Sequence, residues 1–160
     1  MDLFHINPDE LIRNLTQLIT ALVLPMLIAW DREESSRSAG LRTFPLVSMA
    51  ACTFTILATY SFSDQGAQGK VIAGIVTGIG FIGGGAILKD SSKVSGTSTA
   101  AAIWSTGAIG IAVGLGRIEI AIALAIMTFV ALRVIGQVKK EKRQRVKSKR
   151  QFITKARRKD

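Results

Sequence analysis

The sequence has few of the side chains that build disulfides, metal clusters and nucleophilic active sites. Its 160 residues include one cysteine, Cys52, and one histidine, His5. A lone cysteine excludes an intrachain disulfide and a cysteine-based metal cluster. Because the histidine lies near the N-terminus, the apolar segments contain no nucleophile paired with a base, and we expect no catalytic residues and no enzyme activity.

Charged side chains are also missing from long stretches of the chain. Hydrophobic residues make up 48% of the sequence, yet the formal net charge is +10, with most of the Lys and Arg after Gly136. Charge-free windows of roughly 20 residues, separated by short polar links, are typical of membrane-spanning helices. The N-terminus has no cationic segment followed by a cleavage site, so we expect the first span to stay in the membrane.

The predicted fold class is therefore all-α, a polytopic transmembrane bundle of about five spans with a basic cytoplasmic tail. The expected domains are a transmembrane domain at 1–136 and the tail at 137–160. Asn7 and Pro8 predict a helix start, and Pro25 is expected to kink the first span. The expected spans are about Leu11–Trp30, Phe44–Phe62, Val71–Leu88, Thr97–Leu115 and Ile118–Ile135.

The third and fourth spans are rich in glycine. The spacing places many of these glycines on restricted faces of a helix. In lipid such a face lets two helix backbones approach closely, which predicts a tightly packed helical hairpin. A homodimer formed through Gly74, Gly78 and their neighbours is a further hypothesis. The glycines are Gly74, Gly78, Gly80, Gly83, Gly84 and Gly85, followed by Gly107, Gly110 and Gly114.

Residues 78–83, GIGFIG, match the G-x-G-x-x-G pattern of dinucleotide-binding proteins. That pattern needs a strand before it, a helix opening after it and an acidic residue about 20 positions further on. Here the flanks are continuously apolar, and Ser98-Thr99-Ala100 stands where the acidic residue would lie. Helix packing explains the glycines better than nucleotide binding does.

The distribution of Lys and Arg predicts the orientation in the membrane. Positive residues are retained on the cytoplasmic side, so the first link, the third link and the tail are expected there, with the N-terminus outside. The tail either lies along anionic headgroups of the bilayer or is a solvated segment that fixes the topology. Without an aromatic platform, nucleic acid is not an expected partner. The first and third links contain Arg32, Arg37, Arg42, Lys89 and Lys93, and the second and fourth contain Lys70 and Arg117.

Acidic side chains gather where the first predicted span ends. Asp31 and Glu33 are candidate metal ligands, because magnesium prefers oxygen donors and needs only one or two carboxylates. An ion pair between Asp31 and Arg42 that joins two spans is the alternative. No other cofactor is expected.

Several segments, taken in order, resemble the MgtC/SapB family of bacterial inner-membrane proteins over about residues 29–136. The acidic position of the family's E-R-E-like motif is Asp31 here, and Ser95 and Thr97 replace a basic residue and a leucine before the fourth span. The residues that carry the resemblance include Asp31, Arg32, Glu33, Gly40, Arg42, Thr43, Gly78, Gly80, Gly83, Gly85, Gly96, Thr99 and Trp104.

The resemblance implies a role in adaptation to scarce magnesium and, in pathogens, in survival inside host cells. It also implies action on other membrane proteins, including the ATP synthase, rather than direct transport. Long family members carry a soluble C-terminal domain, in whose place this sequence has the basic tail. Two hypotheses stay open: a modulator that binds other membrane proteins, and a carrier or channel that passes Mg²⁺ or another cation by way of Asp31 and Glu33.

Overall fold

The computed structural model describes residues 7–35, 39–90, 93–134 and 136. Contacts divide the chain into two units, Met1–Phe129 and Val130–Asp160. The helices and strands described below belong to the first unit unless stated otherwise. In the second unit, residues 130–134 and 136 are helical. The predicted basic tail lies outside the described residues, and the division into domains at residue 136 stays a prediction.

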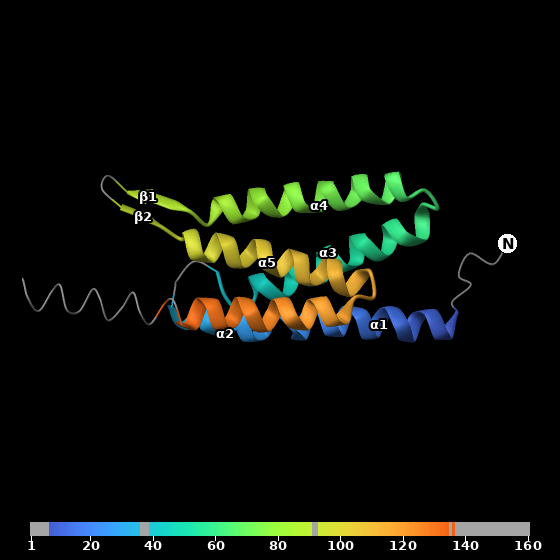
Figure 1. Cartoon of the computed structure of the whole chain (residues 1–160), viewed down its shortest axis with the longest axis horizontal. Coiled ribbons are helices and arrows are strands. Elements are labelled where there is room, and N and C mark those ends of the chain that lie inside the picture. The colour runs from blue at the N-terminus through green and yellow to red at the C-terminus, as the bar shows by residue number, and fades with distance from the viewer. Residues whose placement is uncertain (1–6, 36–38, 91–92, 135, 137–160) are drawn as a thin grey trace, which may run out of the picture. The chain divides into compact units, whose positions relative to one another are not determined.

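Helices make up most of the described chain (Figure 1), which confirms the all-α prediction. A small antiparallel hairpin between two of them was not predicted. Residues 118–134 are also helical. The elements are α1 (Pro8–Val23), α2 (Met26–Ser35), α3 (Thr43–Ser61), α4 (Gln65–Gly85), β1 (Leu88–Asp90), β2 (Lys93–Ser95) and α5 (Thr97–Gly114).

Side-chain caps begin two of the helices. The Asn7 side chain accepts a hydrogen bond from the backbone N–H of Asp9 at 3.1 Å, and Pro8 is the first helical residue. This start was predicted and is confirmed. Asp64 caps α4 in the same way, accepting from the N–H of Ala67 at 2.8 Å. Such a cap satisfies a backbone donor that the first helical turn leaves unpaired.

Pro25 separates α1 from α2, as predicted, because proline has no N–H to donate to the helix. The interruption is slight. The N–H of Leu24 still donates to the carbonyl of Thr20 at 3.0 Å, and the N–H of Ala29 donates to the carbonyl of Pro25 at 2.9 Å. Residues Pro8–Glu33 therefore form one 26-residue helical stretch whose apolar part could cross a membrane.

The helix continues past the end of the first predicted span. We expected a link from Asp31, but α2 continues to Ser35, so Asp31, Arg32 and Glu33 lie on its last turns. Arginine and glutamate have good helix propensity, and no glycine or proline interrupts the helix before Gly40. Charge alone was therefore a poor marker of where the helix stops.

Within the described ranges, three helical stretches are long and apolar enough to cross a membrane: Pro8–Glu33, Thr43–Ser61 and Gln65–Gly85. The count of five spans stays a prediction, as does the orientation. Figure 1 shows the end of α2, the start of α3 and the β1–β2 hairpin toward one end of the first unit, with the α3–α4 turn toward the other. This is the arrangement that successive crossings require.

The helix α5 lies at the centre of the first unit, in contact with α1, α3 and α4. Its Ile103, Ile109 and Val113 are fully or almost fully buried. By contrast, only 11% of the most apolar stretch of α4 is buried, against 44% of that of α3. The helix α4 is thus an outer helix that leaves most of its surface uncovered.

Candidate functional site

The acidic residues singled out from the sequence lie where α2 approaches α3. Asp31 and Arg32 are only 6% and 8% exposed, and among the described residues they are the charged side chains that are buried. The Nε of Arg32 donates to Oδ2 of Asp31 at 3.1 Å, and its Nη2 donates to the same oxygen. Burying a charge is costly unless a partner neutralises it, so each side chain makes the burial of the other possible.

The side chain of Glu33, on α2, binds the backbone just before α3. Its Oε2 accepts a hydrogen bond from the N–H of Leu41 at 3.0 Å. Gly40 is buried beneath this carboxylate, where an added Cβ would lie 1.7 Å from Oε2 and 3.1 Å from the Cβ of Glu33. Only a residue without a side chain fits under Glu33 in this position.

The same loop starts α3. The carbonyl of Gly40 accepts from the N–H of Thr43 at 3.0 Å and from the N–H of Phe44 at 3.2 Å. The structure therefore brings together two of the predicted motif segments, residues 31–33 and 40–43. The last residues of α2 hold the first turn of α3 in place.

The carboxylates of Asp31 and Glu33 each place an oxygen on a protein donor, Asp31 on Arg32 and Glu33 on the N–H of Leu41. In the described part of the chain, no three His, Cys, Asp or Glu side chains are grouped so that they could hold a metal ion. A metal ion at Asp31 and Glu33 stays a prediction.

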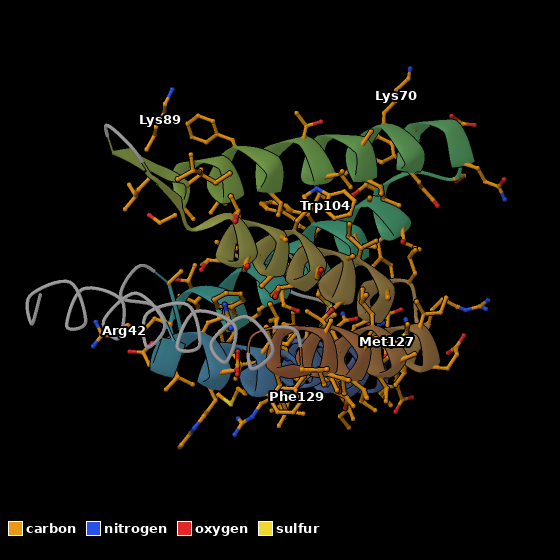
Figure 2. The ribbon with its side chains drawn as sticks, turned by 60° about the vertical axis from the view of Figure 1, so that its left-hand side comes forward. Arg42, Lys70, Lys89, Trp104, Met127 and Phe129 are labelled. Carbon is orange, nitrogen blue, oxygen red and sulfur yellow. The ribbon has the colours of Figure 1, made fainter. Side chains whose placement is uncertain are left out.

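The alternative pairing of Asp31 with Arg42 is not the one observed. The ion pair that Asp31 makes is with Arg32, its neighbour on α2. Arg42 is exposed at the start of α3 (Figure 2). The two helices are joined at this point by Glu33 and the loop backbone rather than by an ion pair between Asp31 and Arg42.

The glycines of α5 make close contacts, but only one of them makes its contact within the predicted hairpin with α4. A Cβ at Gly110 would lie 2.1 Å from the carbonyl oxygen of Ser48, and one at Gly114 would lie 2.7 Å from the Cβ of Thr55. Both neighbours belong to α3. Gly107 instead faces α4, where a Cβ would lie 2.1 Å from Cδ1 of Ile79. Two of these three glycines thus pack α5 against α3.

The glycines of α4 differ from those of α5. The predicted hairpin forms, since α4 contacts α5, and Gly83 takes part with an added Cβ placed 3.1 Å from the carbonyl oxygen of Ala100. The prediction that the remaining glycines of α4 also pack in this hairpin is wrong. The helix α4 lies at the outside of the first unit, and only part of its surface contacts α5. A Cβ would meet nothing within 4 Å at Gly74, Gly78, Gly80, Gly84 and Gly85.

Three further motif residues lie at or on α5. Gly96 precedes the helix with a φ of 84°, and a Cβ there would lie 1.9 Å from the carbonyl oxygen of Ala86. Thr99 is 2% exposed in the first turn, whereas Trp104 is 53% exposed (Figure 2). Gly96 is thus required by the turn, and functional roles for Thr99 and Trp104 stay predictions.

Polar groups within the helices are mostly satisfied locally. The hydroxyls of Thr55 and Thr106, both buried, donate to the carbonyls four residues earlier at 2.7 and 2.9 Å. A threonine hydroxyl that bonds back to its own helix needs no partner on another helix. Ser48 is an exception, since its fully buried hydroxyl has no hydrogen-bond partner.

The sequence did not predict a polar contact that joins α1 to the end of α5. Nε2 of Gln17 donates to the carbonyl oxygens of Val113 and Gly114 at 2.9 and 3.4 Å. Gln17 thus adds a side-chain donor at the end of α5, where the carbonyl of Val113 also accepts from the N–H of Gly116 at 2.9 Å. The signal was available as a glutamine inside an apolar span, but not the identity of its partner.

Comparison with known proteins gives a match over most of the chain. The model of the MgtC family matches residues 18–141. The Escherichia coli K12 protein named "Putative magnesium transporter YhiD" is 36% identical over 129 residues, 76% of this chain and 60% of that protein. "Protein MgtC" of Salmonella typhimurium strain 14028s is 38% identical over 114 residues, 71% of this chain and 48% of that protein.

An uncharacterized protein of Haemophilus influenzae is similar over a longer stretch. It is 32% identical over 155 residues, 88% of this chain and 65% of that protein. The chain therefore spans about half to two thirds of the length of these relatives. No solved structure matches the chain.

Proposed function

The chain belongs to the MgtC family, and on that premise we propose that it is a multi-pass membrane protein that supports magnesium homeostasis by binding other membrane proteins. The link to magnesium comes from the name of the Escherichia coli relative. The proposed location is the bacterial plasma membrane, with the N-terminus outside and the C-terminus cytoplasmic, as the distribution of Lys and Arg favours.

One observation favours a modulator over a transporter. Among the described residues, the buried charged side chains are Asp31 and Arg32, which are neighbours at the end of α2 and bind each other. Ionisable groups inside membrane helices normally mark the path of an ion. The remaining buried polar side chains are hydroxyls on α3 and α5. A pair of opposite charges at one end of the helices does not provide a path across them.

Direct transport of Mg²⁺ or another cation is the second candidate. It is favoured by the name of the Escherichia coli relative and by the exposed carboxylate of Glu33 near the loop before α3. In that case Mg²⁺ is the cargo, and Glu33 would meet it as a hydrated ion, since magnesium keeps several of its waters in most protein sites.

The first experiment compares growth of a strain that lacks the protein with growth of its parent across a magnesium titration. A defect confined to low magnesium, restored by the wild-type chain, is the expected result. Equal growth of the two strains at every magnesium concentration would refute a role in magnesium homeostasis.

The second experiment separates the two candidates with Glu33→Gln. The amide oxygen of glutamine can still accept from the N–H of Leu41, so the loop keeps its hydrogen bond while the charge is lost. A modulator should restore growth in low magnesium with this variant, and proteoliposomes of the wild-type chain should show no magnesium flux. Flux in the wild-type chain that Glu33→Gln abolishes would instead establish transport.

A matched pair of variants tests Asp31. Asp31→Asn removes the negative charge of the carboxylate to which the buried guanidinium of Arg32 donates, and this should destabilise the fold. The double variant Asp31→Asn, Arg32→Gln removes both charges. If the ion pair is structural, the double variant regains part of the protein level lost in the single one and restores growth accordingly.

A further inference from the structure

A positively charged side chain lies within the first apolar stretch. Arg13 follows Pro8, the first residue of α1, by five residues, so it lies about 7–8 Å along the helix axis from the start of α1. No described carboxylate forms an ion pair with Arg13, although Asp9 and Glu10 lie one turn before it on the same helix. Charged groups at such positions in a membrane helix normally find a countercharge or reach the headgroups.

A neutral side chain fixes the position of the Arg13 guanidinium. Its Nη2 donates to the hydroxyl oxygen of Tyr60 on α3, and its Cζ lies 5.8 Å from the centre of the Tyr60 ring. These contacts orient the guanidinium but do not neutralise its charge. Gln17, one turn further along the same face of α1, binds the end of α5 and holds this face against the first unit. Arg13 is therefore in position before any ligand arrives.

The remaining hydrogen-bonding groups of Arg13 and Tyr60 are donors. Arginine has five N–H donors, and the bond to Tyr60 uses one of them. The Tyr60 oxygen accepts that bond, so its hydrogen stays available for another acceptor. Within the described ranges, neither side chain donates to any further acceptor. A positive charge with several adjacent donors matches a phosphate group, whose oxygens arginine binds in a bidentate manner.

The site lies at the depth of the lipid headgroups. Tyr60 is the residue before the last of α3, and Asp64 caps α4 directly after the turn. Figure 1 shows this turn and the start of α1 toward the same end of the first unit. Tyrosine is enriched at the boundary between the hydrocarbon core and water, because its ring is apolar and its hydroxyl is polar.

Apolar side chains continue from the site toward the middle of the helices. Leu57 lies one turn before Tyr60 on α3 and is 54% exposed. On α1, Leu15 and Ile19 are 47% and 60% exposed. A molecule with a phosphate group and acyl chains therefore finds donors and an uncovered apolar surface next to each other, whereas free phosphate would use the donors alone.

We propose that Arg13 and Tyr60 bind the phosphate of a phospholipid in the leaflet that surrounds the start of α1, with the acyl chains along the exposed apolar side chains of α1 and α3. The proposal rests on the membrane location of the chain. It does not depend on the orientation or on a role in magnesium homeostasis, and its test contains no measurement of growth.

The test measures binding of dioctanoyl phosphatidylglycerol to the purified chain in detergent micelles by native mass spectrometry. Arg13→Gln removes the charge but keeps an amide that can donate to Tyr60, and it should weaken binding by roughly tenfold or more. The matched control is Arg117→Gln. Arg117 is also exposed, but its Nε already donates to Oε1 of Glu119 at 2.7 Å, so this variant should bind as the wild type does.

A second variant, Tyr60→Phe, keeps the ring over which Arg13 lies and removes the hydroxyl. It should fold even if Arg13→Gln lowers the protein level, and it should weaken binding by about two- to tenfold, the effect of losing one hydrogen bond. Two other probes distinguish the sources of the ligand. Dioctanoylglycerol has the same acyl chains without a phosphate, and inorganic phosphate has no chains, so neither should bind comparably.

Four results would overturn the proposal. Unchanged binding in both Arg13→Gln and Tyr60→Phe would exclude these side chains from the site. An equal loss in Arg117→Gln would indicate attraction to the overall positive charge. Equal binding of dioctanoylglycerol would show that the chains alone are recognised. Displacement of the lipid by inorganic phosphate at the same concentration would assign the site to free phosphate.

Discussion

The contact between α3 and α5 offers a sharp test of the fold through Gly110. A Cβ at this position would lie 2.1 Å from the carbonyl oxygen of Ser48 and 3.0 Å from the Cβ of Ala51. Nonbonded carbon atoms are most favourable at roughly 3.5–4.0 Å. Gly110→Ala must therefore push the two helices apart by more than about 1 Å at this point. Neither helix can yield by changing a rotamer, since one of the two neighbours is backbone.

The expected cost follows from two opposing effects. Overpacking a tight contact costs about 1–3 kcal/mol, and a rigid backbone neighbour places Gly110→Ala near the upper value. Alanine is favoured over glycine in a helix by about 1 kcal/mol, which offsets part of the cost. We expect a net loss of about 2 kcal/mol in the free energy of unfolding.

The matched control is Gly80→Ala in α4. A Cβ at Gly80 would meet nothing within 4 Å, and Gly80 is exposed on the outer helix. This variant keeps only the gain in helix propensity and should be as stable as the wild type or up to about 1 kcal/mol more stable. Unfolding in mixed micelles, followed by tryptophan fluorescence, measures both variants. Equal stability of Gly110→Ala and Gly80→Ala would refute the close approach of α3 and α5.

Three other substitutions test separate features. Gln17→Leu removes the hydrogen bonds to the end of α5 and should lower stability by about 0.6–2 kcal/mol in the same unfolding assay; no change would mean that the bond is absent in the membrane. Gly96→Ala should prevent accumulation of folded protein, because the new Cβ meets a backbone oxygen at 1.9 Å, whereas Gly116→Ala, with φ at 72° and open space around it, should lose only about 1–2 kcal/mol. Glu33→Ala and Gly40→Ala should each destabilise the loop but not additively, since both displace the same carboxylate; additive losses in a double-mutant cycle would separate the two residues.

The local features of the fold could be predicted from the sequence. Asn7 and Pro8 specify a helix start, and Pro25 interrupts the helix, because both effects depend only on the residue and its immediate neighbours. The end of α2 could not be predicted in this way. Its charged residues look like a link although they have good helix propensity, and the partner of Glu33, the N–H of Leu41, lies beyond the end of α2.

The glycines show a second limit of the sequence. The G-x-x-x-G spacing is present at Gly74 and Gly78 in α4 and again at Gly110 and Gly114 in α5, so the pattern predicted the same packing role for both. Which face is covered depends on α3, which packs against the α5 glycines and leaves those of α4 open. No local property of either segment indicates which of the two glycine faces is covered.

The two glycine pairs therefore have separable consequences. Substitutions at Gly110 and Gly114 alter contacts between α5 and α3, so they should lower stability. An added Cβ at Gly74 or Gly78 meets nothing within 4 Å, so alanine at either position should leave the stability unchanged or raise it by up to about 1 kcal/mol through helix propensity. If Gly78→Ala instead lowers stability as much as Gly110→Ala does, α4 packs within the chain more closely than its open surface indicates.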